Sequence, residues 1–191
     1  MNNDPLIFDF AMAQDKPSSF RKDKSNVCPF CDTGNLTDIY EKSGPMIWLH
    51  NKFPTLRDTL QTVLIESDDH HGDIASYSKD YNRKLMRFSM HCFEKMAQDS
   101  RFKSTLWYKN YGPLSNGSLV HPHMQIVGLE KEDGYKYIYP NNFEGITVFE
   151  NEGVNVNFAT HPVQGFQEIN INLKNKKIPV SIYGQTGFKW Q

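Results

Sequence analysis

The sequence has few cysteines, no long apolar run and no excess of either charge. Its three cysteines are too few and too odd in number for a disulfide framework. No apolar run approaches the ~20 residues that a membrane-spanning helix needs. The start of the chain, Met-Asn-Asn-Asp-Pro, lacks the positive residues and apolar core of a signal peptide. We therefore expect a soluble cytoplasmic protein with no membrane partner.

The charge balance limits the kind of partner. The formal net charge is -1 and the isoelectric point is near 6.6, so the chain has no overall basic field. Binding that depends on neutralising many backbone phosphates is therefore not expected, and we predict no nucleic-acid partner. At 191 residues the chain is long enough for one well-buried core.

The hydrophobic pattern predicts an α+β fold. One amphipathic helix is expected from Ser78 to about Gln98, because apolar residues recur there at spacings of three and four and Ser78 is a suitable N-cap. Cys92 lies on that apolar stripe and is assigned to the core. Strands are expected before and after the helix, which indicates an antiparallel sheet with the helix packed on one face. The predicted strands are 46–50, 59–66, 104–109 and 119–129.

The chain divides into three predicted regions. Residues 1–26 are polar and interrupted by prolines, and we interpret them as an arm, or alternatively as a strand around 6–10 on the domain edge. Residues 27–130 form the main domain. Residues 131–191 form a β-rich extension without a helical pattern, in which short runs are expected at 146–149, 154–158, 168–173 and 180–183. The segment from Gly153 weakly resembles the one from Gly44, so the extension is a possible start of a second copy.

A pair of cysteines, Cys28 and Cys31, has the CxxC spacing that can place two thiolates on one metal ion. A structural zinc would need two more ligands, and histidines must supply them if Cys92 is in the core. One of the adjacent pair His70 and His71, together with a histidine of the later His-Pro-His stretch, would complete a Cys2His2 site. The alternatives are a redox pair or two ordinary buried thiols.

The stretch from Asn110 to Gln125 carries the strongest chemical signal. As a strand, it would place His121, His123 and Gln125 on one face. The loop before it, Gly112 to Gly117, is rich in Gly, Pro, Ser and Asn, and should expose backbone N–H groups that suit an anion such as phosphate. A neutral imidazole can attack phosphorus and form a covalent intermediate. The combination predicts phosphate chemistry, with Ser118 and Gln125 as donors beside His123.

These motifs together resemble the histidine-triad (HIT) superfamily, and specifically its galactose-1-phosphate uridylyltransferase-like branch. Gln125 in place of a third histidine is the mark of that branch, whose motif reads His-Pro-His-x-Gln. The resemblance covers residues 28 to about 129 and rests on motifs in the same order along the chain: Cys28-Pro29-Phe30-Cys31, Asn51-Lys52-Phe53-Pro54, Ser67-Asp68-Asp69-His70, and Asn110-x-Gly112-x5-Ser118-x2-His121-x-His123-x-Gln125.

The resemblance implies a role for each matching residue. His123 matches the nucleophile and Gln125 the amide that holds the phosphoryl oxygens. The ligands of a structural zinc are implied to be Cys28, Cys31, His70 and His121, which favours His70 over His71. Substrate contacts are implied for Asn51, Asn110, Gly112 and Ser118.

The expected function is that of a HIT-like nucleotidyltransferase or hydrolase. It would act on a nucleotide-sugar or nucleoside polyphosphate through a nucleotidyl-histidine intermediate. The resemblance also suggests a homodimer. The chain departs from the family at Leu119 and Val120, where Asn-Pro is usual, and only the beginning of the family's second half is expected here. The alternative is therefore a zinc-stabilised nucleotide-binding module without catalysis.

Overall fold

The computed structural model describes most of the chain. It covers residues 6–9, 11, 28–111, 119–163, 165, 167–174, 182–183 and 189–190, the last two pairs by their backbone.

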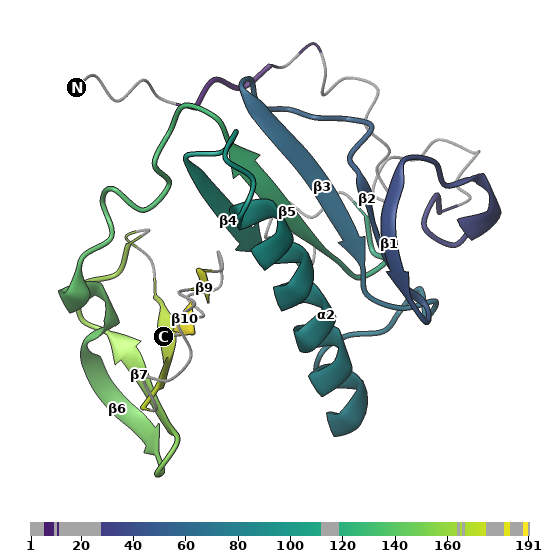
Figure 1. Cartoon of the computed structure of the whole chain (residues 1–191). Helices are drawn as coiled ribbons and strands as arrows, with labels where there is room; N and C mark the ends of the chain where they lie inside the picture. Colours follow the sequence, from purple (N-terminus) through teal and green to yellow (C-terminus); the bar gives the residue numbers. More distant parts are fainter. Residues whose placement is uncertain are drawn as a thin grey trace.

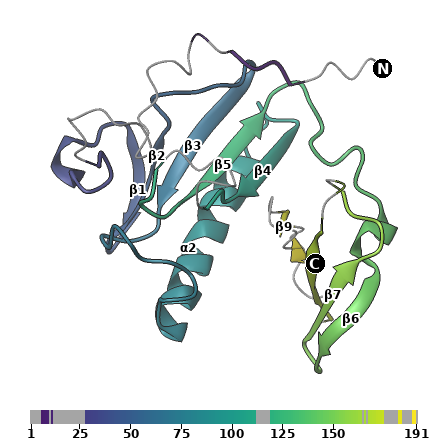
Figure 2. The ribbon, with the colours of Figure 1, turned by 180° about the vertical axis from the view of Figure 1, so that it is seen from behind.

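The main domain is a five-stranded antiparallel sheet with one long helix on one face. The strand order is β1-β2-β3-β5-β4, and each neighbouring pair is antiparallel. Helix α2 (Lys79–Ala97) lies in front of the sheet in Figure 1 and behind it in Figure 2. The architecture confirms the predicted α+β class. The strands are β1 (Ile39–Ser43), β2 (Met46–His50), β3 (Thr59–Ile65), β4 (Ser104–Tyr108) and β5 (His123–Leu129).

Helix α2 begins and packs as its sequence predicts. The Ser78 hydroxyl accepts a hydrogen bond from the Tyr81 N–H, which satisfies one of the helix's unpaired N-terminal donors. Its apolar stripe is buried against side chains from the strands that alternate toward it. The shared core includes Trp48, Leu64, Leu85, Phe88, Cys92, Met96, Trp107, Met124 and Ile126.

Two strands of the main sheet differ from the prediction. Strand β1 was not predicted, because it is short and mostly polar and pairs with β2 through a hairpin at Gly44, whose φ of 60° suits glycine. The strand predicted at 119–129 starts at His123 in the structure, four residues later than predicted. Pro122 has no N–H to donate to a sheet, and its carbonyl instead accepts a bond from the Glu66 N–H.

The N-terminal residues that the structure describes run along the turn before β3. Phe8 forms an isolated antiparallel bridge with Leu56. The Asp9 N–H donates to the Thr55 carbonyl at 2.8 Å, and the Arg57 N–H donates to the Ile7 carbonyl at 3.1 Å. Through these contacts the described residues 7–9 pair with the turn before β3.

A second antiparallel sheet follows the 3-10 helix η3 (Pro140–Phe143), with the order β6-β7-β8. Its asparagines lie on the inner face, where Asn157 and Asn170 are 3% and 2% exposed and donate to the carbonyls of Phe143 and Asn142. The opposite face presents a cross-strand row of Ile146, Phe158 and Ile169, all partly exposed. The strands are β6 (Gly145–Glu150), β7 (Val154–Ala159) and β8 (Ile169–Leu173), followed by β9 (Ile182–Tyr183) and β10 (Lys189–Trp190).

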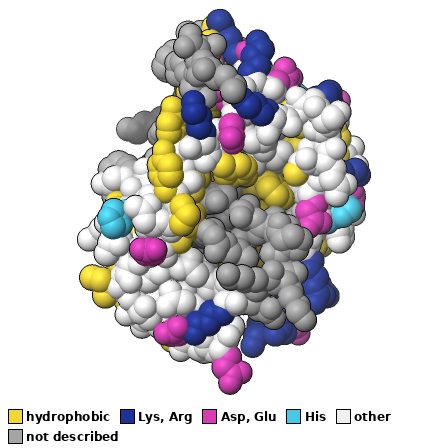
Figure 3. Space-filling model, turned by 60° about the vertical axis from the view of Figure 1, so that its left-hand side comes forward, with side chains coloured by type: hydrophobic (Ala, Val, Ile, Leu, Met, Phe, Trp, Pro, Cys, Tyr) yellow, Lys and Arg dark blue, Asp and Glu magenta, His cyan; other side chains and the backbone are white. Residues whose placement is uncertain are grey.

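The small sheet lies beside the main domain and is joined to it by the segment after β5 (Figure 1). Hydrophobic side chains gather in several groups on this side of the molecule (Figure 3). The three strands β6, β7 and β8 repeat the order and the antiparallel pairing of β1, β2 and β3.

Candidate functional site

Four side chains from distant parts of the sequence meet at one end of the main sheet. One ligand atom from each of Cys28, Cys31, His70 and His121 lies within 4.8 Å of all the others. Cys31 Sγ is 3.4 Å from His70 Nδ1 and 3.5 Å from His121 Nδ1. Two ligands on a tetrahedral metal ion with ordinary Zn–S and Zn–N lengths would be about 3.6 Å apart. The cluster therefore has the composition and spacing of a site that can hold a metal ion.

The environment of His121 fits the role of a ligand. The residue is fully buried, and its Nε2 lies 2.9 Å from the Ser67 carbonyl, which can only accept. Nε2 therefore carries the proton and Nδ1 presents its lone pair to the cluster. Burial also lowers the pKa of His121, which favours the neutral, ligating form.

The two cysteines lie close enough for one to affect the ionisation of the other. The pKa of the Cys31 thiol is raised by desolvation and by the neighbouring Cys28. A bound cation would reverse this effect and stabilise both thiolates. His71, the other member of the predicted histidine pair, is outside the cluster. Its N–H donates to Asp69 Oδ1, and its ring packs edge-on to His70 at 4.6 Å.

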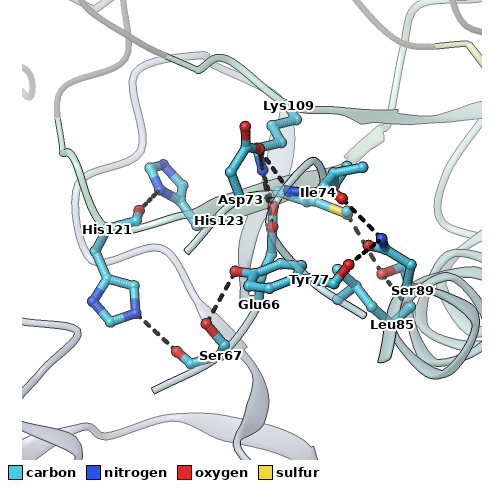
Figure 4. Close-up of polar contacts among 12 residues, drawn as sticks. Glu66, Ser67, Asp73, Ile74, Tyr77, Leu85, Ser89, Lys109, His121 and His123 are labelled. Atoms are coloured by element: carbon cyan, nitrogen blue, oxygen red, sulfur yellow. Dashed lines mark hydrogen bonds and ion pairs between the residues drawn. The ribbon is translucent and has the colours of Figure 1, made fainter. Parts of the chain in front are cut away.

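His123 begins β5 and has a different set of contacts from His121. Its Nδ1 lies 2.8 Å from the His121 carbonyl, so Nδ1 carries the proton and Nε2 presents a lone pair. The Phe30 ring packs edge-on against this imidazole with the ring centres 5.3 Å apart. In Figure 4 the two imidazoles point away from each other. The contact with the His121 carbonyl therefore fixes the orientation of the His123 ring.

Gln125 follows His123 on the same face of β5, while Met124 and Ile126 point into the core beneath α2. The prediction that His121 also belongs to this strand row is wrong, because β5 starts at His123 and His121 lies before Pro122. Gln125 pairs across the sheet with Tyr108 of β4, whose hydroxyl donates to Gln125 Oε1 at 3.1 Å.

The predicted substrate contacts are only partly described. Asn51 forms the turn after β2, where its Oδ1 accepts a bond from the Phe53 N–H. Asn110 is half-buried just after β4. Gly112 and Ser118, with the predicted anion loop of residues 112–117, lie outside the described residues.

A buried ion pair lies on the helix side of the sheet at the end of β4. Lys109 Nζ is 2.7 Å from Glu66 Oε1 and 2.9 Å from Oε2, and 3.7 Å from Asp73 (Figure 4). The side chain of Glu66 is 0% exposed and that of Lys109 is 13% exposed. Burial raises the pKa of Glu66, and Lys109 opposes that rise. The pair holds the residue that directly precedes Asn110.

Local sequence patterns do not predict several of these contacts. Tyr108, Ser67 and the ion pair become neighbours of the site only through strand register, which no local pattern reveals. Phe30 could have been found, because it lies between the two cysteines and must follow them to the cluster.

Comparisons with known proteins identify the family of this chain and other proteins with its fold. Residues 8–132 match the family described as "Domain of unknown function (DUF4931) N-terminal domain". A crystal structure of a DUF4931 family protein from Bacillus cereus ATCC 10987 is 44% identical, and the match covers 70% of this chain and 62% of that one, with a TM-score of 0.67.

Two more distant structures share the fold. A uridylyltransferase is 17% identical over 71% of this chain and 55% of its own, with a TM-score of 0.54. An ADP-glucose phosphorylase from Arabidopsis thaliana with bound ADP-glucose is 14% identical over 78% of this chain and 59% of its own, with a TM-score of 0.58. They confirm the predicted uridylyltransferase-like fold. The chain spans between 55% and 62% of these three solved chains.

One further match is short. A 33-residue stretch is 64% identical to part of a di-/tripeptide transporter of Lactobacillus helveticus, and it covers 17% of this chain and 7% of that protein. Within the described residues, no helix has the length and apolar character needed to cross a membrane.

Proposed function

The chain belongs to the DUF4931 family, and from this premise and its site we propose that it is a nucleotidyltransferase or nucleotide-phosphate hydrolase. The proposed substrate is a nucleotide-sugar or a nucleoside polyphosphate, and His123 is the proposed nucleophile. The observation that carries this proposal is the hydrogen bond between His123 Nδ1 and the His121 carbonyl, which leaves Nε2 as the basic nitrogen. The ring of an exposed histidine without such a contact is not held in one tautomer.

The proposed reaction has two displacements. In the first, His123 Nε2 attacks the α-phosphorus and a P–N bond forms. The bond from the α-phosphorus to the bridging oxygen breaks, and the β-phosphate leaves with that oxygen, as a sugar phosphate from a nucleotide-sugar or as phosphate or a longer polyphosphate from a nucleoside polyphosphate. In the second, water or a phosphate-bearing acceptor attacks the same phosphorus and the P–N bond breaks. Splitting the transfer in this way replaces one difficult step by two easier ones. The amide of Gln125 would donate to the phosphoryl oxygens as their charge develops.

We propose that Cys28, Cys31, His70 and His121 bind a structural zinc ion. The donor set and the Ser67 carbonyl behind His121 support this assignment. A bound zinc ion would fix His121, and the carbonyl of that residue accepts the hydrogen bond that orients His123. In this proposal the metal acts on geometry alone, and the chain's own residues contact the nucleotide.

The proposal is tested by intact-mass analysis. The protein is incubated with a panel of nucleotide-sugars and nucleoside polyphosphates, quenched without acid, and examined for an added nucleoside monophosphate. The expected adduct is labile to acid, absent from His123→Ala, and present in the control His50→Ala, which alters a histidine on β2. No adduct and no turnover with any nucleotide would contradict the enzymatic proposal.

The chain's span of 55% to 62% of its solved relatives motivates one competing function. A binding module without catalysis would bind a nucleotide and keep nearly the same affinity in His123→Ala, without turnover. Calorimetric titration of both proteins with the same nucleotides separates the two functions.

A further inference from the structure

The hydrogen bond from Tyr108 to Gln125 has a consequence for the direction of the glutamine amide. We infer that Tyr108 is a positioning residue, whose hydroxyl holds the Gln125 carboxamide with its oxygen toward β4 and its NH2 group toward the phosphoryl group. The inference rests on the proposed function, because it assigns the donor that would stabilise the transferred phosphoryl group.

The two residues are held in register by the sheet. Tyr108 and Gln125 are direct partners across the β4–β5 ladder, and Tyr108 is the last residue of β4. Directly opposed residues have Cβ atoms about 4.5–5.5 Å apart, close enough for their side chains to meet without large rotamer changes. Gln125 shares its face of β5 with His123, two residues earlier, so an amide fixed here is also fixed relative to the proposed nucleophile.

The chemistry of the two groups determines which way the amide faces. A carboxamide offers an acceptor oxygen on one side and an NH2 donor on the other, and a phenol hydrogen needs an acceptor. Among the described residues, Gln125 Oε1 is the hydrogen-bond partner of the Tyr108 hydroxyl, at 3.1 Å. Turning the amide around would leave the phenol hydrogen without that acceptor, a cost of about 1–3 kcal/mol for a buried donor.

The phenol also stays protonated. Burial raises the pKa of Tyr108 to about 12, so near neutral pH the group is a donor and cannot become a phenolate that would repel the amide oxygen. With Oε1 engaged by the Tyr108 hydroxyl, the NH2 group lies on the other side of the carboxamide carbon. Within the described part of the chain, Nε2 has no hydrogen-bond partner, so these donors are available to a substrate oxygen.

The structural consequence is tested by NMR of the full chain. The Gln125 side-chain amide signals are identified by their loss in Gln125→Glu. We expect weak nuclear Overhauser effects between these amide hydrogens and the Tyr108 ring hydrogens next to the hydroxyl, because the oxygen faces the ring. Strong effects would show the amide turned around and would overturn the inference. This measurement needs no turnover, so it can fail or succeed independently of the proposed activity.

The functional consequence is tested by a double-mutant cycle on the rate of adduct formation. Tyr108→Phe is expected to slow the rate by roughly 10- to 100-fold while the nucleotide affinity changes by less than about 3-fold, because the donor matters most in the transition state. In a Gln125→Ala background the same substitution should have almost no further effect.

The matched control is Tyr135→Phe, which removes a tyrosine hydroxyl that donates to the Thr105 backbone carbonyl of β4, three residues before Tyr108. It should leave the rate within about 2-fold of the parent. An unchanged rate in Tyr108→Phe, or an equal loss with and without Gln125, would contradict the positioning role. Absence of any adduct in the parent protein would contradict the proposed function, and the NMR measurement would still decide the orientation.

Discussion

Two imidazoles that are two residues apart in the sequence donate to different carbonyls through different ring nitrogens. His121 gives its Nε2 hydrogen to a carbonyl and turns Nδ1 toward two sulfurs and a second histidine. His123 gives its Nδ1 hydrogen to a carbonyl and leaves Nε2 as the basic nitrogen. The pattern His-Pro-His predicted two functional histidines, but the choice of nitrogen depends on carbonyls contributed by Ser67 and by His121 itself. Those partners follow from the folded chain and cannot be read from the spacing.

The partly buried tyrosines predict that the protein loses stability at alkaline pH. Burial raises the pKa of Tyr108 to about 12, and it also raises the pKa values of Tyr77, Tyr81 and Tyr40. An unfolded phenol ionises near pH 10, so between pH 10 and 12 the unfolded state binds fewer protons than the folded state. The contribution of these tyrosines to the free energy of unfolding should therefore be complete below pH 10 and fall as the pH rises from 10 to 12.

The check on this prediction is urea unfolding at pH 9, 10 and 11, with phenolate absorbance followed in parallel. Tyr108→Phe should lose less stability over this range than the parent, by on the order of 1–2 kcal/mol. Equal losses in the two proteins, with every tyrosine ionising near pH 10, would contradict the assignment.

Secondary-structure elements differed in how well their sequences predicted them. The apolar stripe of α2 and the apolar run of β2 are sufficient to predict these two elements, because burial and local periodicity agree there. Strand β1 has two charged residues, Glu41 and Lys42, and it depends on pairing with β2 for its conformation. The start of β5 differs from the prediction because Pro122 interrupts the ladder inside a stretch that otherwise alternates. The order β3-β5-β4 joins strands that lie far apart in the chain, which no local pattern can specify.

The end of β4 is expected to depend on the ion pair between Lys109 and Glu66. Removing the lysine leaves a fully buried carboxylate without its cation, so Lys109→Met should lower the free energy of unfolding by about 3–5 kcal/mol. A second ion pair, Lys131 with Asp58 at 2.9 Å, is mostly exposed, and Lys131→Met should cost less than about 1 kcal/mol. Urea unfolding of the two variants makes the comparison. Similar losses in both would show that burial is not the deciding factor.

Within the described residues, the five-stranded main sheet and the three-stranded small sheet have opposite arrangements of polar and apolar faces. The main sheet buries apolar residues beneath α2, whereas the small sheet buries asparagines against η3 and leaves Ile146, Phe158 and Ile169 partly exposed. Composition could predict a β-rich extension. It could not predict which face is buried, because that depends on carbonyls of η3 that accept from the asparagine side chains.

The predicted division near residue 130 can be tested by truncation. The five strands of the main sheet and all four residues of the metal cluster precede residue 130. A chain ending at Tyr139 should therefore fold, retain one metal ion per chain and keep a cooperative thermal transition. Loss of the metal or of cooperative unfolding would show that the extension is part of the main folding unit.

The predicted homodimer is expected to use the exposed apolar row of the small sheet. Placing a charge in an apolar contact is costly, so Ile146→Lys should weaken self-association at least 10-fold if two copies meet there. Sedimentation velocity over a range of concentrations gives the association constant, with Lys174→Gln, which removes a surface charge, as the control. A parent protein that stays monomeric at all concentrations would contradict the dimer.

The separate roles of His121 and His123 are tested most directly with three proteins: the parent, His121→Ala and His123→Ala. Metal content and nucleotide adduct are measured on the same preparation of each. The parent should contain one zinc ion per chain and form the adduct. His123→Ala should keep the zinc and the melting temperature but form no adduct, whereas His121→Ala should lose zinc and much of its thermal stability. If the two variants lose metal and stability to the same extent, or if His123→Ala still forms the adduct, the two histidines do not have separate roles.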